Sequence, residues 1–183
     1  MEKIYSKLGL LLLLTHFSLT LVSNETNIMI DISEQRLYLL NNEDIVQSFP
    51  ISSSKFGEGS QENSYKTPLG KHSIKDMIGQ GTPLNTIFVS RIDTKRVAEI
   101  IKTNFDTEDD YVTTRILWLD GAEEGINKGK GIDSYDRYIY IHGTHEEGLI
   151  GQKASHGCIR MFNDDVIALY NLVKLGTKVY IRA

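Results

Sequence analysis

Residues 155–161 of the chain read Ser-His-Gly-Cys-Ile-Arg-Met, and Cys158 in this run is the single cysteine of the 183-residue sequence. A second histidine-glycine pair, His142-Gly143, lies upstream at the end of an apolar run. The thiolate form of cysteine attacks carbonyl carbon, and a nearby imidazole can take the thiol proton. A buried structural cysteine needs no such neighbours. The pattern therefore favours an enzyme of acyl transfer.

The composition predicts one globular domain. Hydrophobic residues make up 40% of the chain and charged residues 24%, which is enough apolar material to bury a core. The formal net charge is −4. A chain with this charge has no broad basic surface, so we expect no nucleic-acid partner.

The first residues resemble a secretory signal. Lys3 and Lys7 precede a short apolar run over residues 8–22. A membrane-spanning helix needs roughly 20 apolar residues, so this run is short for a span. Residues 1–23 are therefore expected to be a signal peptide, with an uncleaved anchor as the alternative. The mature protein would then be exported to the periplasm or cell envelope, where a single cysteine cannot form an internal disulfide.

Most of the remaining chain is expected to form β-strands. Ile28, Ile30 and Ile32 alternate with other residues, the pattern of a half-buried strand. Polar turns follow, so the chain should open with a meander of hairpins. Residues 52–66 and 121–136 are expected to be loops. Strands are expected at residues 28–32, 36–40, 45–51, 71–74, 87–90, 113–119, 138–141 and 178–181.

One or two helices should pack against these strands. Thr94 is a candidate cap for a helix ending near Thr103, with apolar residues on one face. Asn163 is a candidate N-cap of a second helix, whose acidic first turn suits the positive end of the helix dipole. Gly176 is the expected cap at its C-terminal end. The architecture is thus expected to be mainly β.

The residues around the cysteine suggest their roles. The carbonyl of Gly143, where the chain is expected to turn, can accept the far N–H of His142 and fix its tautomer. The other imidazole nitrogen can then take the proton of Cys158. Gly157 allows a tight turn that directs backbone N–H groups at one point, as in an oxyanion hole. Arg160 can bind a carboxylate through two hydrogen bonds.

Other interpretations remain open at this point. His142, His156 and Cys158 could be three zinc ligands, although no paired cysteine motif or clear fourth ligand accompanies them. Cys158 could also be an inert buried residue. His145 either lines the site or lies on a solvated loop, and Ser155 is either a turn former or a substrate donor.

With these motifs the chain resembles the catalytic domain of L,D-transpeptidases, the YkuD-type family. The resemblance rests on His142-Gly143-Thr144 and on residues 155–161, with no motif position altered. It also includes the opening hairpin, the turn at residues 67–70 and the final helix and strand. The resemblance therefore covers residues 27–182 as a single catalytic domain and implies a β-sandwich-like fold.

The resemblance also implies the roles of the site residues. Cys158 would be the nucleophile, His142 the general base and acid, and the Gly143 carbonyl the group that orients His142. His156 and Gly157 would support the oxyanion hole. Arg160 would hold a substrate carboxylate. Apart from the resemblance, Ser155, Thr144 and His145 are expected to be further substrate contacts. No metal and no cofactor is expected.

The implied substrate is the peptide stem of peptidoglycan. Cys158 would cleave the bond after the third residue of a tetrapeptide stem and release D-alanine. An amine on a neighbouring stem, or a lysine of an envelope lipoprotein, would then resolve the thioester. An L,D-carboxypeptidase and a non-catalytic peptidoglycan-binding module are the alternatives. The stretch from Ile92 to Asp120 is expected to act as a lid that covers the cleft and selects the acceptor.

Overall fold

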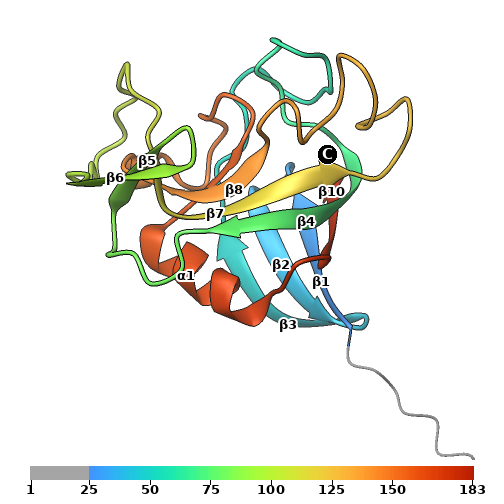
Figure 1. The fold of residues 1–183 in the computed structure, drawn as a ribbon, viewed down its shortest axis with the longest axis horizontal. Coiled ribbons are helices and arrows are strands. Elements are labelled where there is room, and N and C mark those ends of the chain that lie inside the picture. Colours follow the sequence, from blue (N-terminus) through green and yellow to red (C-terminus); the bar gives the residue numbers. More distant parts are fainter. Residues whose placement is uncertain (1–24) are drawn as a thin grey trace, which may run out of the picture.

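The computed structural model describes residues 25–183, so the expected signal peptide of residues 1–23 lies outside the described part. The described chain is mainly β with one α-helix, as expected (Figure 1). Its elements are β1 (Thr26–Asp31), β2 (Arg36–Asn41), β3 (Asp44–Pro50), β4 (Gly70–Ile78), β5 (Thr86–Val89), β6 (Ile92–Val97), β7 (Val112–Gly121), β8 (Tyr140–Thr144), the 3₁₀ turn η1 (Glu147–Leu149), β9 (Ile159–Met161), α1 (Asn163–Leu172) and β10 (Lys178–Arg182).

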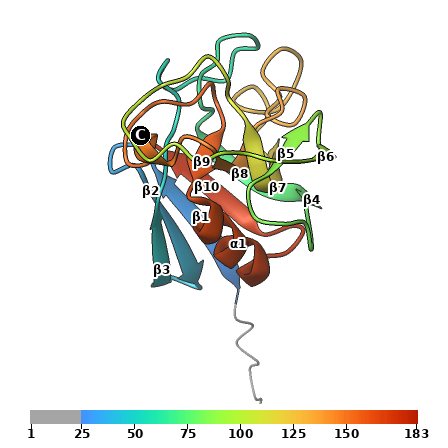
Figure 2. The ribbon, with the colours of Figure 1, turned by 90° about the vertical axis from the view of Figure 1, so that its left-hand side faces the viewer.

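The strands form one sheet in the order β3-β2-β1-β10-β4-β7-β5-β6, and β8 joins β7 to β9. The meander β1-β2-β3 is antiparallel, as the sequence predicts. The last strand, β10, inserts in parallel beside β1, with Ile28 opposite Val179 and Ile30 opposite Ile181. In Figures 1 and 2 the long loops around residues 52–69 and 121–138 gather at one end of the molecule, and α1 lies toward the other end.

The core lies between the two parts of this bent sheet. Side chains on a strand alternate between its faces, and Ile28, Ile30 and Ile32 are each at most 1% exposed. They pack with residues of β8, β9 and α1, including Ile141, Ile159, Met161, Val166 and Leu169. The sandwich-like arrangement predicted from the family resemblance is therefore present, and it supports the strands that carry the site.

The helix expected over residues 94–103 is absent from the described chain. Its first half is the strand β6, which pairs with β5. The Thr94 hydroxyl donates to the carbonyl of Ile87 on that strand, 2.7 Å away, rather than capping a helix. Val97, expected on the buried helix face, is 60% exposed. Pairing with a neighbouring strand has overridden a local pattern that was too short to bury a helix face.

The second expected helix is present, but its ends differ from the prediction. Asn163 is the first helical residue, and Phe162 holds the N-cap position. The Asn163 side chain instead donates to the carbonyl of Thr144 at 2.7 Å and accepts from the Thr113 hydroxyl at 2.6 Å. Gly176 lies in the turn before β10, beyond the helix end at Leu172. Asn163 thus ties the helix to β7 and β8 instead of capping it.

Two further segments differ from the prediction. The strand expected over residues 138–141 begins at Tyr140 and continues to Thr144, because Tyr138 has a left-handed backbone with φ of 59°. The lid expected over residues 92–120 cannot extend over that whole stretch. Most of β7 falls in that stretch, and Leu117 in its middle is fully buried. Only the connection over residues 98–111 lies outside the strands there.

Within the described residues, no helix is long and apolar enough to cross a membrane.

Candidate active site

The pairing of β8 with β9 brings the two motifs together. The strands are parallel, and His142 lies opposite Arg160. Cys158 immediately precedes β9, and its sulfur accepts a hydrogen bond from the backbone N–H of Tyr140 at 3.3 Å. Residues two apart on a strand share a face. Tyr140 and His142 therefore share a face of β8, and Cys158 and Arg160 share a face of the neighbouring segment.

The thiol of Cys158 lies in a mainly apolar environment. It packs against a hydrophobic cluster of Ile116 and the aromatic residues Phe88, Trp118 and Tyr140. The sulfur donates to the carbonyl of Tyr138 at 3.3 Å. Burial raises the pKa of the Cys158 thiol to about 12. The resting residue is therefore a neutral thiol that needs a base when it reacts.

His142 is such a base. Its Nδ1 atom lies 2.7 Å from the carbonyl oxygen of Gly143. A carbonyl only accepts hydrogen bonds, so Nδ1 carries the proton and Nε2 is left as the acceptor. His142 is 1% exposed, and burial lowers its pKa to about 4. At neutral pH the imidazole is therefore uncharged and can accept a proton.

The Gly143 carbonyl orients His142 as expected, but the chain does not turn at this glycine. It lies inside β8 rather than at a turn. A Cβ atom at this position would collide with the side-chain oxygen of Asn163 and would lie 3.0 Å from the carbonyl oxygen of Thr113. Close packing of β7 and α1 against β8 therefore excludes a side chain here.

The turn before Cys158 is held by its own residues. Gly157 has a φ of 121°, which L-residues with side chains rarely adopt. The buried Ser155 hydroxyl donates to the carbonyl of Cys158 at 2.6 Å and accepts from the N–H of Gly157 at 3.3 Å. The Thr67 hydroxyl donates to the carbonyl of Gly157 at 3.0 Å. Of its two expected roles, Ser155 therefore has that of a turn former.

Arg160 does not present its charge to a ligand, so its expected role in gripping a substrate carboxylate is wrong. Its side chain is 1% exposed and lies between two carboxylates of the chain itself. One guanidinium nitrogen is 2.7 Å from Asp110 and the other is 2.9 Å from Glu146. Arg160 instead anchors β9 to these two acidic residues.

Asp110 also contacts His156, whose Nδ1 lies 2.8 Å from its carboxylate. Burial raises the pKa of Asp110, but the hydrogen bond from His156 and the charge of Arg160 outweigh it and hold that pKa well below its usual range. Asp110 thus stays ionised and orients His156 beside the turn. No motif in the sequence marks Asp110, so this contact could not be predicted from the sequence.

Thr144 and His145 form internal contacts instead of the expected substrate contacts. Thr144 is fully buried, and its hydroxyl accepts the N–H of Glu146 at 3.1 Å. His145 is 4% exposed, and its ring packs 4.6 Å from that of Tyr111. Both residues therefore support the loop that carries Asp110.

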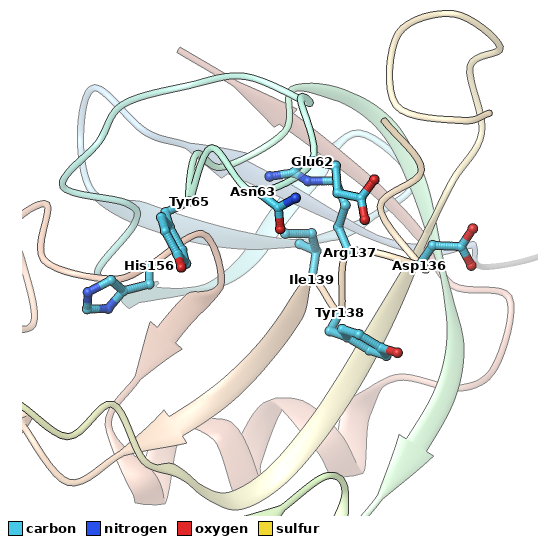
Figure 3. Close-up of a pocket in the computed structure, with 8 residues that line it drawn as sticks. All are labelled: Glu62, Asn63, Tyr65, Asp136, Arg137, Tyr138, Ile139 and His156. Carbon is cyan, nitrogen blue, oxygen red and sulfur yellow. The ribbon is translucent and has the colours of Figure 1, made fainter. Parts of the chain in front are cut away.

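A cavity of about 160 Å³ opens beside the turn (Figure 3). Arg137 in its wall donates to the carbonyls of Gly59 and Lys66, which holds the loop over residues 52–69 against the site. The cavity is lined by Glu62, Asn63, Tyr65, Asp136, Arg137, Tyr138, Ile139 and His156. Only His156 of this set was predicted from the sequence, because the others carry no motif.

His142, His156 and Cys158 were the alternative zinc ligands. Among residues 25–183 no group of three His, Cys, Asp or Glu side chains is placed to hold a metal ion. The Nδ1 atom of His142 is used by Gly143, and that of His156 by Asp110. The site thus places a thiol just before β9 and a neutral base on the paired strand β8, and His156 of the same turn lines the cavity.

A family model described as the L,D-transpeptidase catalytic domain, YkuD, matches residues 25–181. The chain belongs to this family. Over 125 residues it is 47% identical to the probable L,D-transpeptidase ErfK/SrfK of Salmonella typhimurium, covering 64% of this chain and 40% of that protein. It is 46% identical over 52 residues to the putative L,D-transpeptidase YqjB of Bacillus subtilis, covering 28% of each.

Solved L,D-transpeptidases share the fold of this family member. L,D-transpeptidase 3 from Mycobacterium tuberculosis, in complex with a faropenem-derived adduct, aligns with a TM-score of 0.52 and 17% identity, covering 86% of this chain and 60% of that one. An L,D-transpeptidase from Mycobacterium smegmatis aligns with a TM-score of 0.51 and 16% identity, covering 87% and 59%. The chain thus spans less than two thirds of the length of these relatives.

Proposed function

We propose that this L,D-transpeptidase family member uses Cys158 as the nucleophile of acyl transfer on peptidoglycan stem peptides. The observation that carries the proposal is the tautomer and the position of His142. The Gly143 carbonyl fixes the tautomer of His142 and leaves Nε2 as the proton acceptor. His142 lies on β8, which pairs with the strand that follows Cys158. A thiol just before one strand and a neutral imidazole on the paired strand have the chemistry of nucleophile and general base.

In the first step, the sulfur of Cys158 attacks the carbonyl carbon of the third stem residue. Because the pKa of Cys158 is raised and that of His142 lowered, a resting thiolate-imidazolium pair is disfavoured. The proton therefore moves from sulfur to Nε2 as the carbon-sulfur bond forms. Backbone N–H groups of the turn at residues 157–158 are the proposed donors to the developing oxyanion.

The intermediate then collapses to a thioester. The bond to D-alanine breaks, and the imidazolium of His142 returns its proton to the leaving amine. In the second step an acceptor amine attacks the thioester carbonyl, loses a proton to His142 and releases Cys158. A stem amine gives a 3→3 cross-link, and a lysine of an envelope lipoprotein gives an anchored protein.

The second candidate is an L,D-carboxypeptidase, in which water resolves the same thioester. The two reactions share the residues of the first step and differ only in the acceptor. A non-catalytic binding module is less consistent with the site, because binding alone requires neither a thiol nor a base of fixed tautomer. A substrate in the cell wall also supports the proposal that residues 1–23 direct export.

The experiment is mass spectrometry of the purified protein with disaccharide-tetrapeptide. A cross-linked dimer that lacks one D-alanine supports transpeptidation, and tripeptide with free D-alanine supports the carboxypeptidase. Cys158→Ala should abolish both, and a carbapenem should form an adduct of 1:1 stoichiometry on Cys158 only. Turnover that survives in Cys158→Ala would overturn the proposal.

A further inference from the structure

Arg91 lies at the tip of the β5-β6 hairpin. The two turn residues, Ser90 and Arg91, both have a left-handed backbone, with φ of 47° and 68°. Glycine, asparagine and aspartate usually occupy such turns, because other side chains strain the backbone there. Strain of this kind is often found where a side chain is held for function. The turn directs the Arg91 side chain across the end of the hydrophobic cluster beside the nucleophile.

The Arg91 guanidinium is held in place by three aromatic residues. Its central carbon lies 4.8 Å from the ring centroid of Trp118 and 4.9 Å from that of Tyr138. Its Nη1 atom donates to the hydroxyl of Tyr140 at 3.2 Å. Stacking on rings holds the guanidinium plane without using its edge, which carries the N–H donors.

No carboxylate of residues 25–183 forms an ion pair with Arg91. In the described part of the protein, no carboxylate lies within 4.0 Å of its nitrogens, whereas Arg160 and Arg182 each contact carboxylates. A guanidinium has five N–H donors in a planar fork that matches a carboxylate. Most of this donor capacity is left for a ligand, because the aromatic rings accept none of it in the plane.

A cavity of about 310 Å³ adjoins Arg91. Its walls are Arg91, Trp118, Tyr135, Asp136 and Tyr138. Tyr138 and Asp136 also line the cavity of Figure 3, so the two cavities share this wall. Tyr138, a wall residue of this second cavity, also accepts a hydrogen bond from the Cys158 thiol through its backbone carbonyl. Asp136 is exposed, where water screens its charge.

We propose that Arg91 binds a carboxylate of the stem peptide in this aromatic-walled cavity, and so determines which stems are accepted as acyl donors. The inference rests on the proposed function of Cys158. The sequence assigned carboxylate recognition to Arg160, which is buried. The proposal assigns it to Arg91, which the β5-β6 hairpin places beside the cavity. Two carboxylates of the donor fit this chemistry: that of the third-residue side chain and that of the terminal D-alanine.

The test compares three donors: the disaccharide-tetrapeptide, the same compound amidated on the third-residue diaminopimelate side chain, and the same compound amidated at the C-terminus. The measurement is kcat/KM for release of D-alanine or its amide. The carboxylate that binds Arg91 is identified by the amidation that lowers kcat/KM on the order of tenfold to a hundredfold, the ratio expected for a charge-assisted hydrogen bond.

The decisive variant is Arg91→Gln, with Arg96→Gln on the same hairpin as the matched control. Arg96 is exposed and lines neither cavity. Arg91→Gln should lower kcat/KM for the free acid to the value of the discriminated amide and leave that amide nearly unchanged. Arg91→Lys should recover part of the preference, and Arg96→Gln should retain all of it.

Three results would overturn the inference. One is a wild-type enzyme that does not discriminate between the donors. Another is discrimination that persists in Arg91→Gln. The third is an equal loss on all three donors, which would indicate only support of the hairpin. If the wild type converts none of the donors and forms no carbapenem adduct, the proposed function fails and this inference fails with it.

Discussion

The Nδ1 atom of His156 lies 2.8 Å from the carboxylate of Asp110, a residue 46 positions earlier in the chain. The same carboxylate lies 2.7 Å from the guanidinium of Arg160. One loop residue therefore fixes both the turn before the nucleophile and the strand after it.

Asp110→Asn should weaken both of these contacts. The buried Arg160 would keep only Glu146 as a charged partner, and we expect a loss of about 2 kcal/mol in the free energy of unfolding. Urea denaturation measures this loss. Asp109→Asn is the control, because Asp109 is exposed and its hydrogen bonds within residues 25–183 are with its neighbours Tyr111 and Thr107. Equal stability of the two variants would contradict the role of Asp110.

The pH dependence of acylation should follow the buried pair rather than free side chains. His142 has a pKa lowered to about 4, so it remains a base down to that pH. The rate of carbapenem acylation should therefore be flat around neutral pH and should fall only as the pH drops toward 4. An acid limb near 6.5, the ordinary histidine value, would show that burial does not lower the pKa of His142 and would contradict this prediction.

His72 should make the protein less stable in mild acid. It is 2% exposed, with Nδ1 at 3.0 Å from the Gly70 carbonyl and Nε2 at 2.9 Å from the Ser134 hydroxyl. Burial lowers its pKa from 6.5 to about 4. The unfolded chain binds this proton first as the pH falls, so stability should decrease between pH 6.5 and 4, by on the order of 3 kcal/mol from this residue.

Denaturant titrations at pH 7 and 4.5 for the wild type and His72→Gln test this. The variant should be less sensitive to pH in that window, although His142 continues to contribute. Asp31, whose pKa the Ser33 hydroxyl lowers from 3.8, contributes stability that is lost only below that window. An unchanged pH dependence in His72→Gln would count against the assignment.

Gly143→Ala should destabilise the fold. The new methyl group would meet Asn163 and the carbonyl of Thr113, and overpacking of this kind costs about 1–3 kcal/mol. Gly151→Ala is the comparison, because that glycine has a φ of 97° but open space around it. Its loss should be limited to backbone strain of about 1 kcal/mol. The melting temperature of each variant distinguishes the two costs.

The sequence by itself determined the strands whose side chains alternate, the acidic start of α1 and the pairing of one cysteine with a histidine-glycine motif. These features depend on neighbours along the chain. The alternation of apolar residues and the spacing within a motif can be read directly from the order of residues.

Only the tertiary structure decided the remaining features. It made residues 92–97 a strand, because β5 offered a partner with unpaired backbone groups. It buried Arg160 between Asp110 and Glu146. It placed Arg91, whose guanidinium pairs with no carboxylate of residues 25–183, at the tip of a distant hairpin. The charge and size of these residues are visible in the sequence, but the partner of each comes from a segment far along the chain. Local patterns cannot specify such contacts, because packing of the whole sheet determines which segments meet.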